Sequence, residues 1–125
     1  MLGNKNVAAN IAVKNLEVAR KFYEGVLGLQ QVDAEGQHLV AYRSGSSTLL
    51  VYSSGFAGTN KATTATWTVG NDVESLVTTL RTKGVAFEHY DLPGTMRKGD
   101  VHVSGDRKVA WFKDPDGNIL CIVNG

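Results

Sequence analysis

The chain of 125 residues changes from a strand pattern to a helix pattern twice, and this duplication constrains its fold more than any other feature. Residues 7–13, VAANIAV, show a two-residue period, which is typical of a strand. From Asn15, a residue favoured at helix N-caps, apolar side chains recur at helical spacing until Gly28, where a helix is expected to end. The first half therefore begins with a strand followed by an amphipathic helix.

The second half repeats this order. Residues 65–69, ATWTV, again have a two-residue period, and Asp72 is the expected N-cap of a second helical pattern that ends at Gly84. Asp72 follows Asn15 by 57 residues. A module of about 60 residues is only marginally stable alone, so we expect the two halves to share an interface and to form one domain, residues 1–125.

Three short strand patterns follow each helical pattern, and turn signals separate them. They are LQQVD (29–33), HLVAYR (38–43) and TLLVYS (48–53) in the first half, and VAFEHY (85–90), KVAWFK (108–113) and ILCIV (119–123) in the second. A long loop is expected over residues 93–107. The sequence therefore predicts an α+β fold of two βαβββ modules, residues 7–53 and 64–123, joined by a Gly/Ser-rich linker at 54–63. Together the modules are expected to form an open, curved, eight-stranded sheet.

One face of each sheet is expected to pack under its helix, which leaves the other face free. Two twisted sheets of this kind curve into an open cup, and a concave surface suits a small-molecule ligand. The two-residue period assigns the floor of the cup to small side chains. These are Ala8, Asn10, Ala12, Thr64, Thr66 and Thr68.

Composition excludes several classes of protein. Thirteen basic and twelve acidic residues give a formal charge of +1. Such a small net charge does not favour binding to nucleic acid, which is strongly negative. Cys121 is the single cysteine, so no internal disulfide can form and a reducing compartment is expected. The chain has no apolar stretch of signal-peptide or membrane-spanning length. We expect a soluble, cytoplasmic protein with neither a nucleic-acid nor a membrane partner.

Two segments in this order carry a family resemblance: NLEVARKFYEGVLGL, residues 15–29, and WFKDPDGNILCIV, residues 111–123. With the duplicated βαβββ pattern, they resemble the vicinal oxygen chelate superfamily. Glyoxalase I, extradiol dioxygenases, fosfomycin-resistance enzymes and bleomycin-binding resistance proteins belong to it. The resemblance covers nearly the whole chain and implies the fold predicted above. It also implies a homodimer, since such pairs are common in the family.

Metal-using members of the family hold a divalent ion with His, Glu or Gln side chains of the first and last strands. The resemblance places the first-strand ligand at Ala8, its second-module equivalent at Thr64 or a residue next to it, and the last-strand ligand at Cys121. A cation that polarises an oxygen needs three or four converging nitrogen or oxygen donors. The three histidines, His38, His89 and His102, lie on different expected strands or loops. We therefore expect no metal and no other cofactor.

Two residues near the C-terminus each allow two interpretations. Cys121 is either a reactive thiol or a small hydrophobe on the cup wall, and its Ile and Val neighbours supply no base to activate it. Trp111 and Phe112 must face opposite sides of their strand. In fosfomycin-type relatives the position of Trp111 faces the ligand, so its ring would stack on a planar molecule. The alternative is that Trp111 fills the core.

Two further residues lie in expected loops. Phe56, in the linker, would close over a ligand, dock a second subunit or tether its own sheet. His102 is a candidate for proton transfer, because histidine is the residue type most often used for it near neutral pH, and a surface histidine without a role is the alternative. We expect no catalytic residue. The candidate ligand-binding residues are Asn10, Phe56, Thr64, Thr66, His102, Trp111 and Cys121.

Three functions remain open from these observations. The first is metal-independent binding of a small, partly aromatic organic ligand, similar to bleomycin-type antibiotic resistance proteins. Those proteins offer acidic surface to a cationic drug, whereas this chain is nearly neutral, so the ligand would differ. The second is a glyoxalase-like lyase or isomerase that uses His102 or Cys121. The third is an interaction protein whose free sheet face pairs with a second copy.

Overall fold

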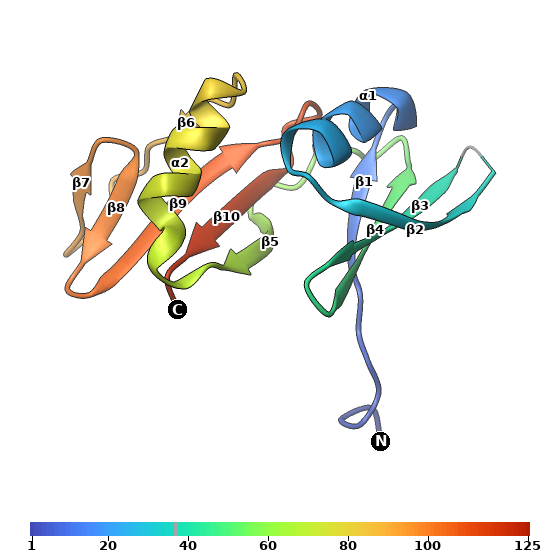
Figure 1. The fold of residues 1–125 in the computed structure, drawn as a ribbon, viewed down its shortest axis with the longest axis horizontal. Coiled ribbons are helices and arrows are strands. Elements are labelled where there is room, and N and C mark those ends of the chain that lie inside the picture. The colour runs from blue at the N-terminus through green and yellow to red at the C-terminus, as the bar shows by residue number, and fades with distance from the viewer. Residues whose placement is uncertain (37) are drawn as a thin grey trace. The chain divides into compact units, whose positions relative to one another are not determined.

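The structure is a computed structural model that describes residues 1–36 and 38–125, and it divides into two compact units, residues 1–59 and 60–125. Each unit contains one sheet and helical segments (Figure 1). The first unit comprises β1 (Ala9–Val13), α1 (Leu16–Arg20), the π-helix η1 (Lys21–Val26), β2 (Gln30–Glu35), β3 (Leu39–Ser44) and β4 (Ser47–Ser53). The second comprises β5 (Thr63–Thr68), the 3-10 helix η2 (Gly70–Asp72), α2 (Val73–Thr82), β6 (Phe87–Glu88), β7 (Met96–Lys98), β8 (Val101–Ser104), β9 (Arg107–Lys113) and β10 (Ile119–Val123). The predicted α+β class is confirmed.

The first unit has the predicted βαβββ order. Its strands lie in the order β1-β4-β3-β2, with β1 parallel to β4 and the other pairs antiparallel. Asn15 caps α1 as predicted, because its Oδ1 accepts hydrogen bonds from the backbone N–H groups of Glu17 (2.9 Å) and Val18 (3.2 Å). The helix widens into η1 and ends before Gly28, whose φ of 74° suits a helix terminus.

The second unit contains two strands more than predicted. Its strands lie in the order β5-β10-β9-β8-β7, and β6 also pairs with β9. The expected strand at 85–90 is reduced to the two residues of β6, and the expected loop at 93–107 contains β7 and β8. Two-residue turns, Gly99-Asp100 and Gly105-Asp106, connect β7 to β8 and β8 to β9. Both glycines have φ near 60°, as the first central position of a tight hairpin turn requires.

Strand β10 is the centre of the second sheet. It pairs with β5 in parallel and with β9 antiparallel, and all five of its residues are buried. Helix α2 crosses one face of this sheet (Figure 1). Phe112 is 1% exposed, whereas the neighbouring Trp111 packs against a cluster formed by Val109, Cys121 and Val123. The alternation of β9 therefore separates the helix-covered core from a second, smaller apolar cluster on the opposite face.

The turn between β9 and β10 is held by buried polar side chains. Asp114 Oδ1 accepts hydrogen bonds from the backbone N–H groups of Asp116 and Asn118, both at 2.9 Å, and its Oδ2 accepts one from Asn118 Nδ2 at 2.8 Å. Asp114 and Asn118 are 5% and 4% exposed. Because these bonds satisfy buried donors beside the strand ends, they hold the register in which Ile119 pairs with Lys113.

Within the described residues, no helix is long and apolar enough to cross a membrane.

Replacement of Asp114 tests this turn. Asp114→Ala leaves buried donors of the turn without an acceptor, so the free energy of unfolding should fall by about 2–3 kcal/mol. Urea denaturation followed by circular dichroism measures the change. The matched control is Asp91→Ala, at an exposed carboxylate, which should stay within about 0.5 kcal/mol of wild type. Equal losses in the two variants would contradict this role of Asp114.

Candidate functional site

A cavity of about 360 Å³ lies on the face of the second sheet that carries Trp111. Its wall is formed by side chains of β5, β8, β9 and β10 and by the segment that precedes β7. The lining residues are Thr63, Thr66, Leu92, Thr95, His102, Ser104, Arg107, Val109, Trp111, Cys121 and Val123. All of them belong to the second unit.

Strand register brings three of the predicted residues together. Cys121 of β10 pairs with Thr66 of β5 on one side and with Trp111 of β9 on the other. Paired residues of neighbouring strands point to the same face of a sheet, so these side chains form a row across the cavity floor. Trp111 remains half-buried there. Its position is therefore on the free face of the sheet.

A β-bulge alters the row at the start of β5. Ile119 pairs with Thr63 and Leu120 pairs with Ala65, which leaves Thr64 as an extra residue. Thr63 consequently lines the cavity, and its Oγ1 accepts a hydrogen bond from Trp111 Nε1 at 3.2 Å. Thr64, which an unbroken alternation would place there, is not among the described residues that line the cavity.

His102 lies in β8 and is 2% exposed, not in a surface loop. Its Nε2 accepts a hydrogen bond from the backbone N–H of Tyr90 at 3.0 Å. The ring stacks on Tyr90 and meets Trp111 edge-on, with centroids 4.9 Å apart. Because Nε2 acts as an acceptor, the proton of the neutral ring is on Nδ1. Nδ1 is buried and has no hydrogen-bond partner among the described residues.

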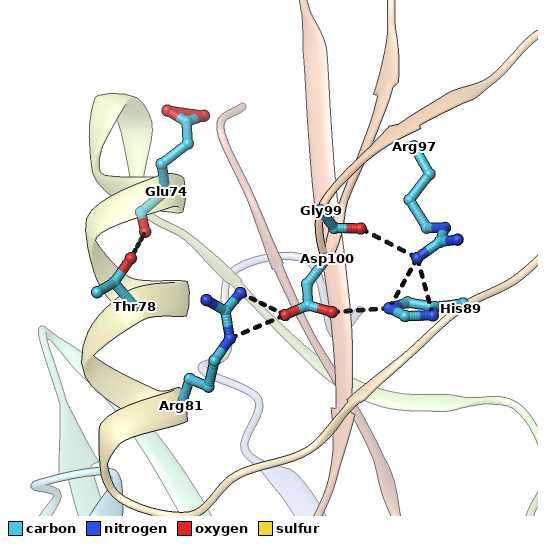
Figure 2. A network of polar contacts seen from close by, with 7 residues as sticks. All are labelled: Glu74, Thr78, Arg81, His89, Arg97, Gly99 and Asp100. Atoms are coloured by element: carbon cyan, nitrogen blue, oxygen red, sulfur yellow. Dashed lines mark hydrogen bonds and ion pairs between the residues drawn. The ribbon is translucent and has the colours of Figure 1, made fainter.

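A network of polar contacts supports the start of β8, next to His102 (Figure 2). Asp100, in the β7–β8 turn, bonds His89 Nε2 through Oδ1 at 2.7 Å and Arg81 of α2 through Oδ2. Arg97 Nη1 lies 3.0 Å from His89 Nδ1 and donates to the Gly99 carbonyl. The hydrogen bond from His89, with that of Arg81, lowers the pKa of Asp100 below its ordinary value. The network connects the strand that carries His102 to α2.

The other predicted site residues lie in the first unit, among its strands and turns. Asn10 is exposed on β1, and Phe56 is 80% exposed in a turn after β4. Neither lines this cavity. The sequence did not predict several of the lining residues. They lie at the β5 bulge, in and before the unpredicted β7 and β8 strands, and on the cavity face of β9 and β10. These are Thr63, Leu92, Thr95, Ser104, Arg107, Val109 and Val123.

Cys121 is 4% exposed on the cavity floor. Burial raises the pKa of its thiol, and a hydrogen bond with Thr66 and the positive charge of Arg107 lower it by less. The thiol therefore stays protonated at neutral pH, which favours the small, apolar wall residue over the nucleophile.

The positions that hold metal in other family members do not fit a divalent cation in this chain. Ala8 offers no donor, Thr64 offers a neutral hydroxyl and Cys121 offers a protonated thiol. Residues 1–36 and 38–125 contain no group of three or more His, Cys, Asp or Glu side chains placed to hold a metal ion.

Alkylation of Cys121 tests its burial. Native protein should react with iodoacetamide at pH 8 at least about tenfold more slowly than protein unfolded in urea, because both burial and a raised pKa limit the thiolate. Mass spectrometry measures the rate, and Cys121→Ser, which removes the only thiol, gives the background. Equal rates in the two states would show an accessible, reactive thiol.

Removal of the Asp100 charge tests the network. Because the pKa of Asp100 is lowered in the folded state, its carboxylate stabilises the fold at pH values above the ordinary pKa of about 3.8. This stabilisation is lost as the pH falls through the pKa that Asp100 has in the folded protein. Asp100→Asn should therefore be less stable than wild type at pH 7, and the difference should shrink as the pH falls below about 3.8.

Urea denaturation across this pH range measures that difference, and Asp91→Asn is the exposed control, expected to match wild type at each pH. A difference between Asp100→Asn and wild type that does not change with pH would contradict the assignment.

The comparisons with known proteins agree with the fold. The family model described as Glyoxalase/Bleomycin resistance protein/Dioxygenase superfamily matches residues 6–122. A search of curated protein sequences gave no match. Similar solved structures include an integron cassette protein from the mobile metagenome of the Halifax Harbour sewage outfall, with 19% identity, a TM-score of 0.72 and coverage of 96% of this chain and 97% of the other.

Two similar structures carry the names of enzymes or resistance proteins. Lactoylglutathione lyase from Agrobacterium tumefaciens has 16% identity and a TM-score of 0.72, with 98% and 95% of the two chains covered. The fosfomycin resistance protein FosX from Mesorhizobium loti has 12% identity and a TM-score of 0.71, with 100% and 94% covered. At these identities the likeness shows the fold. Because the family model spans nearly the whole sequence, the chain belongs to the glyoxalase/bleomycin resistance protein/dioxygenase superfamily.

Proposed function

We propose that this protein binds a small, partly aromatic organic ligand in the cavity of its second unit, and that it does so without a metal. The observation that carries the proposal is that the Trp111 ring is held in place and still partly exposed at the cavity. Its Nε1 is bonded to Thr63 and its ring is supported by the apolar cluster, yet the side chain remains half-buried at a cavity. A large ring held in one orientation with one part exposed is a ready stacking surface.

The cavity has the composition of a small-molecule site. Its volume of about 360 Å³ lies within the ordinary range for such sites, and its wall combines apolar side chains with a few polar groups. Trp111 also meets Tyr90 edge-on, with centroids 5.2 Å apart, and this contact restrains the ring further. Less side-chain freedom therefore remains to be lost when a planar molecule binds.

Metal independence is supported by the donor chemistry at Ala8, Thr64 and Cys121. The names of similar structures, a lactoylglutathione lyase and fosfomycin resistance proteins, are consistent with a small-molecule ligand. A homodimer and a role in antibiotic resistance remain predictions that rest on the family resemblance. The ligand proposal does not depend on either of them.

Loss of the Trp111 ring tests the proposal. A thermal-shift screen of planar aromatic compounds should identify binders, because a ligand at a hundred times its Kd adds about 2.7 kcal/mol to stability. Calorimetric titration of the best binder should then show an affinity about tenfold weaker for Trp111→Leu, since stacking contributes roughly 0.5–1.5 kcal/mol beyond buried area.

The matched control is Trp67→Phe, which removes the other tryptophan and should bind as wild type does. It also leaves Trp111 as the only tryptophan, so quenching of its fluorescence reports the contact directly. Unchanged affinity in Trp111→Leu would contradict the proposal. Turnover of a bound thiol conjugate would instead favour the lyase.

A further inference from the structure

We infer that the ligand carries an anionic oxygen group, of the carboxylate class, beside its planar ring, and that Arg107 and His102 select for that group. This inference rests on the proposed function and specifies the chemical class of the ligand. It excludes a cationic molecule from the cavity.

The charge of the cavity wall is the first observation. Among the described residues that line the cavity, Arg107 is the one with a permanent charge, and none is Asp or Glu. Within the described parts of the chain, the Arg107 guanidinium forms no ion pair. A cation without a counter-charge at the mouth of a low-dielectric cavity attracts an anion, and a guanidinium bonds a carboxylate through two N–H groups.

Strand register places this charge close to His102. Ser104 of β8 pairs with Arg107 of β9, and His102 pairs with Val109 two residues further along. The side chains of these four residues all line the cavity. His102 and Arg107 are therefore diagonal neighbours on one face of the β8–β9 hairpin, which is within the reach of a long side chain.

The unpaired donor of His102 is the second, independent observation. Its Nε2 is occupied by the Tyr90 N–H, so the ring has one further polar group, the buried Nδ1–H, without an acceptor among the described residues. A buried N–H without an acceptor is unfavourable and leaves positive potential in the wall. An oxygen anion in the cavity compensates that potential, whereas a second donor or a cation increases the imbalance.

The remaining polar groups of the wall are compatible with such a ligand. Hydroxyl groups can donate to an oxygen anion, and four of them line the cavity. They belong to Thr63, Thr66, Thr95 and Ser104. The ring of the ligand would lie against Trp111 while its carboxylate lies towards the β8–β9 hairpin, because both side chains that favour an anion are in that hairpin.

Three naphthalene probes that differ only in charge test the inference by calorimetric titration. They are 2-naphthoate, 2-naphthamide and 2-naphthylmethylammonium. Wild-type protein should bind the carboxylate about tenfold more tightly than the amide and should bind the cation most weakly. The preference should decrease as salt concentration rises, because salt screens the charge of an exposed arginine.

Two variants and a matched control assign the preference to residues. Arg107→Gln should weaken naphthoate binding about tenfold and leave naphthamide unchanged. In His102→Gln, the side-chain carbonyl oxygen can still accept the Tyr90 N–H in place of Nε2, but no donor remains at the position of Nδ1. This variant should therefore keep the hydrogen bond to Tyr90 and bind naphthoate with a smaller preference over naphthamide. Lys108→Gln removes the same charge from the neighbouring residue, whose Nζ pairs with Glu74 of α2, and should have no effect.

The outcomes separate the two proposals. If the amide or the cation binds as tightly as the carboxylate or more tightly, and Trp111→Leu still weakens binding, the anion inference is wrong and the ligand proposal stays in place. Equal effects of Arg107→Gln and Lys108→Gln also overturn it, because they would show a response to overall charge. If none of the three probes binds at millimolar concentration, both proposals are wrong.

Discussion

The register of β10 is the constraint on which the cavity depends. This strand lies between β5 and β9, and its alternation sends Leu120 and Ile122 to one face and Cys121 to the other. A shift by one residue would exchange the two sets. The buried hydrogen bonds between Asp114 and Asn118 hold the strand entry at its correct position. A polar turn outside the cavity thereby determines which side chains reach its floor.

Much of the fold could be predicted because the change from a strand period to a helix period is clear in both halves of the chain. The missing parts have local causes. The β7–β8 and β8–β9 turns are Gly-Asp pairs on either side of β8, a hairpin signal that the long-loop interpretation of residues 93–107 overlooked. Asp72 occupies the N-cap position of α2 as expected, but it is also the last residue of η2 and its side chain makes no capping hydrogen bond.

The candidate site was less predictable, because its geometry depends on long-range pairing. Opposite orientation of Trp111 and Phe112 follows from alternation alone, and the structure places Trp111 at the cavity. Thr63 lines the cavity instead of Thr64 because of a β-bulge, and no local sequence signal predicts that bulge. His102 is buried only because β8 joins the sheet, so a residue expected in a loop becomes part of the cavity wall. Arg107 lies at the cavity for the same reason, because it belongs to the β8–β9 hairpin.

The family shows how one fold can serve different chemistry, since the residues on the sheet face decide what is bound. Here that face presents a restrained tryptophan. The most direct test is nuclear magnetic resonance of isotope-labelled protein titrated with 2-naphthoate. The account predicts that chemical-shift changes concentrate at the Trp111 indole N–H and at the amides of Thr66 and Cys121. Changes confined to residues 1–59, with none in β5, β9 or β10, would contradict it.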